Sequence, residues 1–152
     1  MTKKFNIHAR MPYVRIGGRT IFQPPLIAML QTDGSFSHSR NPRGRAAAYL
    51  ETAAQDTIHK QLWEVKDAKN STETEWASIA FGLKFALEND EYVVGVENDN
   101  FGVIAALLHP VSLRHEYARY YRNQIHNLAN QSAWVGLRWI PRQFNKADKI
   151  LR

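Results

Sequence analysis

The hydrophobic residues of this chain run most continuously into Asp33. Segment 27–35 begins with four apolar residues and ends on Asp33, Gly34 and Ser35. Such a run predicts a strand buried on both faces, at the centre of a sheet. That strand would hold the Asp33 carboxylate at the sheet edge on a rigid support. Asp-Gly is also a common turn sequence, so the pair alone does not separate a catalytic group from a turn.

Two further patterns are clear along the chain. Apolar residues recur at helical spacing from Trp76 to Leu87. Alternating residues on either side of Gly17-Gly18 predict a hairpin over 13–22. The other expected elements are strands over 46–50, 58–65, 92–96 and 134–140, and helices over 101–108, 113–130 and 145–152.

The order of these elements predicts the fold class. After the N-terminal hairpin, three strands precede the first long helix, and helices separate the strands that follow. The three strands fit an antiparallel meander, and the helical crossovers fit parallel pairing afterwards. We therefore expect an α/β fold on a mixed sheet, with 26–152 as one domain and 1–25 as a basic N-terminal extension.

Composition limits the class of protein and the compartment in which it is expected. The chain is 44% hydrophobic and contains no Cys. This composition fits a globular protein without disulfides or a thiolate zinc site, and it agrees with a reducing compartment such as the cytoplasm. No apolar stretch is long enough to span a bilayer, so no membrane partner is expected.

The net charge of +6 is unevenly distributed. Residues 51–152 are nearly balanced, whereas residues 1–50 carry a single acid, Asp33. The basic residues of that first third are Lys3, Lys4, Arg10, Arg15, Arg19, Arg40, Arg43 and Arg45. A concentration of positive charge is typical of a polyanion binder, and nucleic acid is the expected partner; a basic tail kept for solubility is the alternative.

Three more carboxylates belong with Asp33. Asp99 closes the apolar strand 92–96, Glu75 opens the long helix, and Asp148 opens the last one. Parallel neighbours would bring Asp33 and Asp99 to the same sheet edge. Oxygen ligands gathered there suit a hard cation such as magnesium. Each acid except Asp33 also has a structural explanation as a helix-start residue, including a capping box at Thr72-x-x-Glu75, and spacing alone does not show that the four converge.

Four segments together resemble the motifs of type 1 ribonuclease H, in order and on the expected elements. The resemblance covers about residues 26–152. Each motif is weak alone, and the fourth is the most telling. The segments are Thr32-Asp33-Gly34-Ser35, Glu75 to Leu83, Glu97 to Ile104, and Trp139 to Asp148.

The resemblance implies a ribonuclease H-like five-stranded mixed sheet and cleavage of the RNA strand of an RNA–DNA hybrid by a monomer. It implies that Asp33, Glu75, Asp99 and Asp148 bind two magnesium ions, with manganese as an alternative, for hydrolysis of a phosphodiester. A hybrid would be recognised by its 2′-hydroxyls and duplex shape. The expected substrate contacts are Gly34, Ser35, Ser71, Thr72, Phe101, Arg142 and Asn145.

The sequence departs from the family pattern at several points. Arg142 stands in place of the mobile His that many members carry before the last Asp, and Thr74 stands where Ala is preferred. Residues 111–130 lack the basic helical protrusion that some members use to bind substrate, so we expect the basic N-terminal extension to bind it instead. The last helix is short enough to be marginal alone. Two rivals remain: a DNA nuclease or transposase-like enzyme with the same fold, and a non-catalytic nucleic-acid-binding module.

Overall fold

The computed structural model describes residues 11–39, 41, 43–109 and 111–152. Within these residues the chain forms one mixed sheet with strand order β1-β6-β5-β2-β3-β4. The strands are β1 (Val14–Gly17), β2 (Ala28–Ser37), β3 (Arg43–Glu51), β4 (Ile58–Val65), β5 (Val93–Asn98) and β6 (Trp134–Trp139). β2, β3 and β4 form the expected antiparallel meander, while β5 pairs in parallel with β2 and β6. The predicted α/β class is therefore confirmed.

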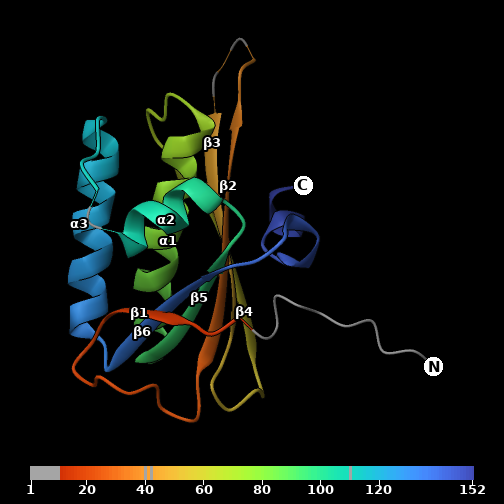
Figure 1. Cartoon of the computed structure of the whole chain (residues 1–152). Coiled ribbons are helices and arrows are strands. Elements are labelled where there is room, and N and C mark those ends of the chain that lie inside the picture. The colour runs from red at the N-terminus through yellow and green to blue at the C-terminus, as the bar shows by residue number, and fades with distance from the viewer. Residues whose placement is uncertain (1–10, 40, 42, 110) are drawn as a thin grey trace.

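Three helices cover one face of this sheet (Figure 1). They are α1 (Ser71–Glu88), α2 (Phe101–Leu108) and α3 (Glu116–Gln131). The main core lies between them and the sheet, where Leu30, Ile79, Leu83 and Val96 are almost completely buried. Gly82 brings α1 close to β2, since a Cβ there would lie 2.6 Å from the Thr32 methyl carbon. No helix in the described part of the chain is long and apolar enough to cross a bilayer.

The opposite face is covered by the C-terminal segment, defined here as residues 141–152 (Figure 1). This segment forms two short 3-10 turns, η2 (Arg142–Phe144) and η3 (Asp148–Leu151). Ala147 and Leu151 pack there against Ala47 and Tyr49 of β3. The α-helix expected over 145–152 is wrong: only about one turn forms, because an isolated helix this short lacks the length for stable i to i−4 bonding.

The predicted N-terminal hairpin is also wrong, and the sheet has six strands within the described residues, not five. β1 forms as expected but pairs antiparallel with β6. Only Gly18 of the Gly17-Gly18 pair has positive φ, whereas a type I′ hairpin turn needs it at both. The amides of Arg19 and Thr20 instead donate to the carbonyls of Ser132 and Ala133, at 3.1 and 2.8 Å. Residues 1–10 of the expected basic N-terminal extension lie outside the described residues.

Candidate active site

Asp33 and Asp99 are neighbours because β2 and β5 are parallel. Gln31 of β2 lies opposite Glu97 of β5 in the register. Asp33 and Asp99 each lie two residues further along, so their carboxylates lie at the same end of this strand pair. β2 itself continues to Ser37, since Asp33 still pairs with Ala47 of β3. Asp33 is thus held by a strand on one side and only 6% exposed.

Glu75 reaches this end of the strand pair from α1. The helix begins at Ser71, and the side chain of Asn70 caps it by accepting from the Glu73 amide at 2.9 Å. The suggested capping box is therefore wrong, and Glu75 is free to accept a hydrogen bond from the Gly34 amide. A Cβ at Gly34 would lie 2.4 Å from the Thr74 carbonyl carbon and 2.6 Å from the Glu75 nitrogen. Glycine at 34 is what lets α1 approach β2 so closely.

The three carboxylates lie close enough to perturb one another. One oxygen from each of Asp33, Glu75 and Asp99 lies within 4.8 Å of the others. Burial, followed for Glu75 by the charge of Asp33, raises the pKa of Asp33 to about 7 and that of Glu75 to about 9. Burial also raises the pKa of Asp99 above its usual range. Without a cation this site therefore favours protonated carboxyl groups.

Asp99 is fixed by side chains from two other elements. The indole Nε1 of Trp139 donates to the Asp99 carbonyl at 2.9 Å. Asn145 donates through Nδ2 to Asp99 Oδ2 at 3.2 Å and to the Thr32 carbonyl at 2.9 Å. Asn145 is buried, so the structure places this expected substrate contact beneath the site, where it orients Asp99. The helix-start role considered for Asp99 belongs to Asn100, which caps α2.

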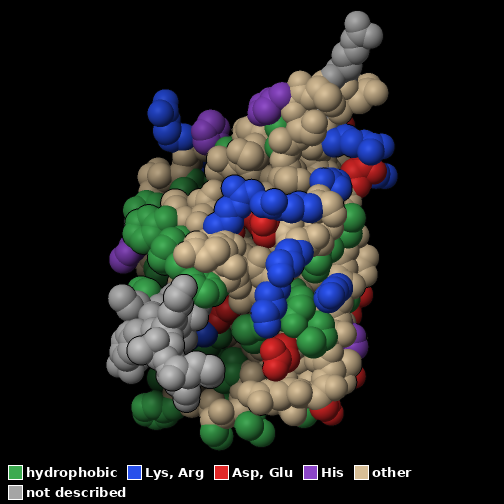
Figure 2. All heavy atoms as spheres, turned by 90° about the vertical axis from the view of Figure 1, so that its right-hand side faces the viewer, with side chains coloured by type: hydrophobic (Ala, Val, Ile, Leu, Met, Phe, Trp, Pro, Cys, Tyr) green, Lys and Arg blue, Asp and Glu red, His purple; other side chains and the backbone are tan. Residues whose placement is uncertain are grey.

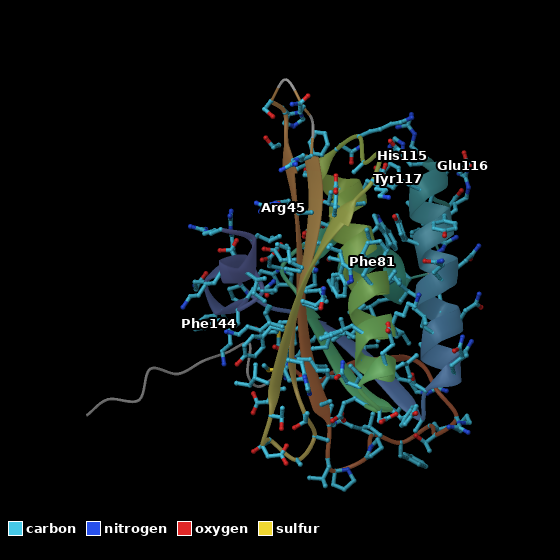
Figure 3. The ribbon with its side chains drawn as sticks, turned by 180° about the vertical axis from the view of Figure 1, so that it is seen from behind. Arg45, Phe81, His115, Glu116, Tyr117 and Phe144 are labelled. Atoms are coloured by element: carbon cyan, nitrogen blue, oxygen red, sulfur yellow. The ribbon has the colours of Figure 1, made fainter. Side chains whose placement is uncertain are left out.

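Asp148 lies in the same pocket but stands apart from the other three. It begins η3, and its two oxygens pair with Arg142 at 3.4 Å and Arg152 at 2.9 Å. Its side chain is 16% exposed, and both arginines are largely exposed. Figure 3 shows Arg45 of β3 directed at this segment, where its guanidinium donates to the Leu151 carbonyl.

The four acids line a pocket of about 320 Å³. Four of the expected substrate contacts share it: Gly34, Ser35, Ser71 and Arg142. Thr72 lines a neighbouring hollow with Trp76 and Asn100. Phe101 is 69% exposed at the start of α2, directly after Asn100, which lines both hollows. Figure 2 views the face that carries the C-terminal segment, and Lys and Arg side chains lie across it with acidic groups between them.

Sequence reasoning missed several residues at or under the site. Asn100 and Arg152 line the pocket. The sequence could have indicated the role of Arg152, because it lies four residues after Asp148, close enough for an ion pair on a helical turn. Glu97 and Gln31 are buried and joined by a hydrogen bond of 2.8 Å. No local pattern identified that pair, since its two members lie 66 residues apart in the sequence and meet only because β2 pairs with β5.

The donor set fits a hard divalent cation. In the described part of the chain, Asp33, Glu75 and Asp99 form the cluster able to share an ion, and every ligand atom is a carboxylate oxygen. Magnesium–oxygen bonds of 2.0–2.1 Å place two ligands of one ion within about 4.2 Å of each other, so a small contraction of this group would suffice. The raised pKa values of Asp33 and Glu75 show that burial disfavours their ionised forms, and a bound cation would favour those forms instead.

A family model described as reverse transcriptase-like matches residues 31–151. The match contains all four carboxylates and leaves out β1. No curated protein matches the chain.

Several solved structures share the fold. An N-terminal RNase H domain from Mycobacterium tuberculosis, fused to maltose-binding protein, has a TM-score of 0.72 at 20% identity, covering 82% of this chain and 89% of that chain. RNase H1 from the halophilic archaeon Halobacterium salinarum has a TM-score of 0.71 at 14% identity, covering 79% and 89%. An RNase H1 isolated from compost by metagenomics has a TM-score of 0.65 at 15% identity, covering 82% and 91%. At these identities the likeness shows a shared fold.

Proposed function

The chain belongs to the reverse transcriptase-like family of the ribonuclease H-like superfamily, and from this membership we propose that it is a metal-dependent ribonuclease H. It would hydrolyse the RNA strand of RNA–DNA hybrids. The observation that carries the proposal is the cluster of Asp33, Glu75 and Asp99, buried at one sheet edge and open to a pocket. A cluster of acids this costly is difficult to explain without a cation that neutralises it.

Each carboxylate has a distinct part in the proposal. Asp33 lies on β2, which pairs with a strand on each side, and it is clustered with Glu75 and Asp99, so we assign it the contact with both ions of a pair. Asp148 would complete the set after exchanging its arginine partners for a cation. A pair of divalent ions at such a site supplies activation of the attacking water and stabilisation of the leaving oxygen.

The residues around the acids would bind and orient the hybrid. Ser35 and Ser71 present hydroxyl groups to the pocket, suited to sugar and phosphate oxygens. Arg142 is exposed beside Asp148 and would take a phosphate when that ion pair opens. The substrate-binding role of the basic N-terminal extension stays a prediction, because Lys3, Lys4 and Arg10 lie outside the described residues.

A cleavage panel tests the proposal. The purified chain is incubated with end-labelled RNA–DNA hybrid, double-stranded DNA or double-stranded RNA, with and without magnesium. We expect cleavage of the RNA strand of the hybrid alone, and only with magnesium. Asp33→Asn should lower kcat/KM by more than about a hundredfold, since even residues behind a metal ligand contribute 10- to 100-fold.

The other outcomes of the panel separate the rival functions. Cleavage of double-stranded DNA would favour a DNA nuclease or transposase-like enzyme on the same fold. Tight hybrid binding with no product at any magnesium concentration would favour a non-catalytic binding module. Near-normal turnover by Asp33→Asn, in protein that melts like the parent chain, would refute the assignment of the site.

A further inference from the structure

A second polar cluster lies beside the site and takes no part in the proposed chemistry. Its centre is Glu97 of β5, which is only 2% exposed. Glu97 Oε2 accepts from the Tyr13 hydroxyl and from Arg138 Nε, each at 2.8 Å, and Oε1 accepts from Gln31 Nε2 at 2.8 Å. A buried carboxylate is costly unless it is fully paired, and this one has partners on both oxygens.

Gln31 carries the cluster onward to the C-terminal segment. Its Oε1 accepts from the backbone amide of Lys146 at 2.8 Å. The orientation of this amide group follows from chemistry: an ionised Glu97 can only accept, and the Lys146 N–H can only donate. Gln31 is 4% exposed, and its amide group bridges Glu97 and Lys146, using the nitrogen toward one and the oxygen toward the other.

The bridge meets the C-terminal segment close to Asp148. Lys146 lies between Asn145, which orients Asp99, and Ala147, which packs on β3. Two residues after Lys146 the chain reaches Asp148 at the start of η3. A 3-10 turn of four residues has little stability of its own, so its position depends on such tertiary contacts.

Away from the C-terminal segment, Glu97 and Arg138 of the cluster bind Tyr13 and Met11, which precede β1. Tyr13 lies over Gly95 and Gly136, where an added Cβ would approach its atoms to 2.4 and 2.7 Å. The Arg138 guanidinium lies 4.1 Å from the centre of the Tyr13 ring and donates to the Met11 carbonyl at 3.0 Å. Met11 and Tyr13 lie before residue 31, where the family model begins to match.

From this arrangement we infer that Gln31 is a positioning residue for Asp148, held in place by Glu97. The inference rests on the proposed metal site. Gln31 contacts no reacting atom; it fixes the backbone at Lys146, and this sets where the Asp148 carboxylate can reach. Tyr13 and Arg138 hold Glu97 on the same face of the sheet, so the segment before β1 indirectly supports the position of the Asp148 carboxylate.

Magnesium affinity, measured by titration calorimetry well below the melting temperature, tests the inference without any need for cleavage. Gln31→Met keeps the volume of the side chain and removes both hydrogen bonds. We expect its magnesium dissociation constant to rise by about tenfold, the lower end of the range for residues that orient metal ligands. Gln61→Met, the same substitution at an exposed position of β4, should leave the constant unchanged.

A double-mutant comparison separates positioning from a general loss of structure. If Gln31 acts through Asp148, Gln31→Met should have no further effect on affinity in the Asp148→Asn background. An unchanged constant for Gln31→Met, or an equal rise in both backgrounds, would overturn the inference. If Gln31→Met does not fold, Gln31→Asn gives the same comparison, because its amide is one methylene too short to bridge. A parent chain that binds magnesium but cleaves nothing would contradict the proposed function and leave this inference standing.

Discussion

The site contains two kinds of carboxylate. Asp33 lies in β2, Glu75 lies in α1 and Asp99 directly follows β5, and one oxygen from each lies within 4.8 Å of the others. Asp148 comes from a four-residue turn and is paired with two exposed arginines instead. The β2–β3 ladder and the packing of α1 fix Asp33 and Glu75, and hydrogen bonds from Trp139 and Asn145 hold Asp99 at the end of β5. Asp148 is held by ion pairs with exposed side chains.

This difference predicts which carboxylates of the site stay in place and which can change partners. Groups on cooperative elements can stay in place despite mutual repulsion, because the whole domain would have to deform to separate them. A group on a turn can change partners at small cost. We therefore expect the three clustered acids to form the permanent part of the site and Asp148 to be the adjustable part.

Breaking the rigid part should have the largest effect. Gly34→Ala would place a methyl group 2.4–2.6 Å from backbone atoms of Thr74 and Glu75, so β2 and α1 would have to separate. We expect a loss of about 3 kcal/mol in the free energy of unfolding, measured by urea denaturation, together with loss of magnesium binding. Gly102→Ala is the matched control, since a Cβ there meets one atom, at 3.4 Å. Equal stability of the two variants would show that this close approach is unimportant.

Comparing single ligands should sharpen the contrast. We expect Asp99→Asn to weaken magnesium binding by about a hundredfold and Asp148→Asn by about tenfold, spanning the range measured for groups around metal sites. The physical reason is that Asp148 must first leave Arg142 and Arg152, so less of its attraction to the cation remains as net affinity. Calorimetry on both variants measures this difference. The reverse order would mean that Asp148 is the dominant ligand.

The smallest expected effect is on pH dependence. The raised pKa values of Asp33 and Glu75 mean that the folded, metal-free protein binds more protons than the unfolded chain between about pH 4 and pH 9. Stability should therefore fall as pH rises, because its slope with pH is proportional to the number of protons bound by the unfolded chain minus the number bound by the folded chain. The fall should be steepest between about 5 and 7, where both carboxyl groups are protonated only in the folded protein, and shallower between about 7 and 9, where only Glu75 still differs. Melting temperatures across this window, without and with magnesium, measure the effect. Asp33→Asn/Glu75→Gln should flatten the slope, and an unchanged slope would place its origin elsewhere.

The sequence was informative wherever a local pattern determines structure. Strands β2 to β6 and the helix at Phe101–Leu108 follow patterns of apolar residues in the sequence, and the parallel pairing of β2 with β5 follows from a helical crossover. Convergence of Asp33 and Asp99 could be expected on that basis. Convergence of Glu75 could not be derived from spacing, since it depends on the close packing that Gly34 allows.

Other features depend on partners far away in the sequence. The Gly17-Gly18 pair looks like a hairpin turn, yet it serves close packing against Ala129 and the backbone of residues 133–134. Asn145 looks like a surface contact, yet its amide donates to Asp99 and Thr32 across the sheet. Neither could be read from neighbouring residues, because both are determined by long-range pairing.

β1 has one more consequence, which concerns the edges of the sheet. Without it, β6 would be an edge strand, with unpaired backbone groups beside Trp134, Val135 and Leu137. An apolar edge of this kind is a template for pairing with another chain, and so for aggregation. The other edge, β4, carries charged and polar residues (Lys60, Gln61 and Glu64) between the exposed Ile58 and Leu62, and charges on an edge strand oppose such pairing. Four residues outside the matched family region thus cover the apolar edge that β6 would otherwise present.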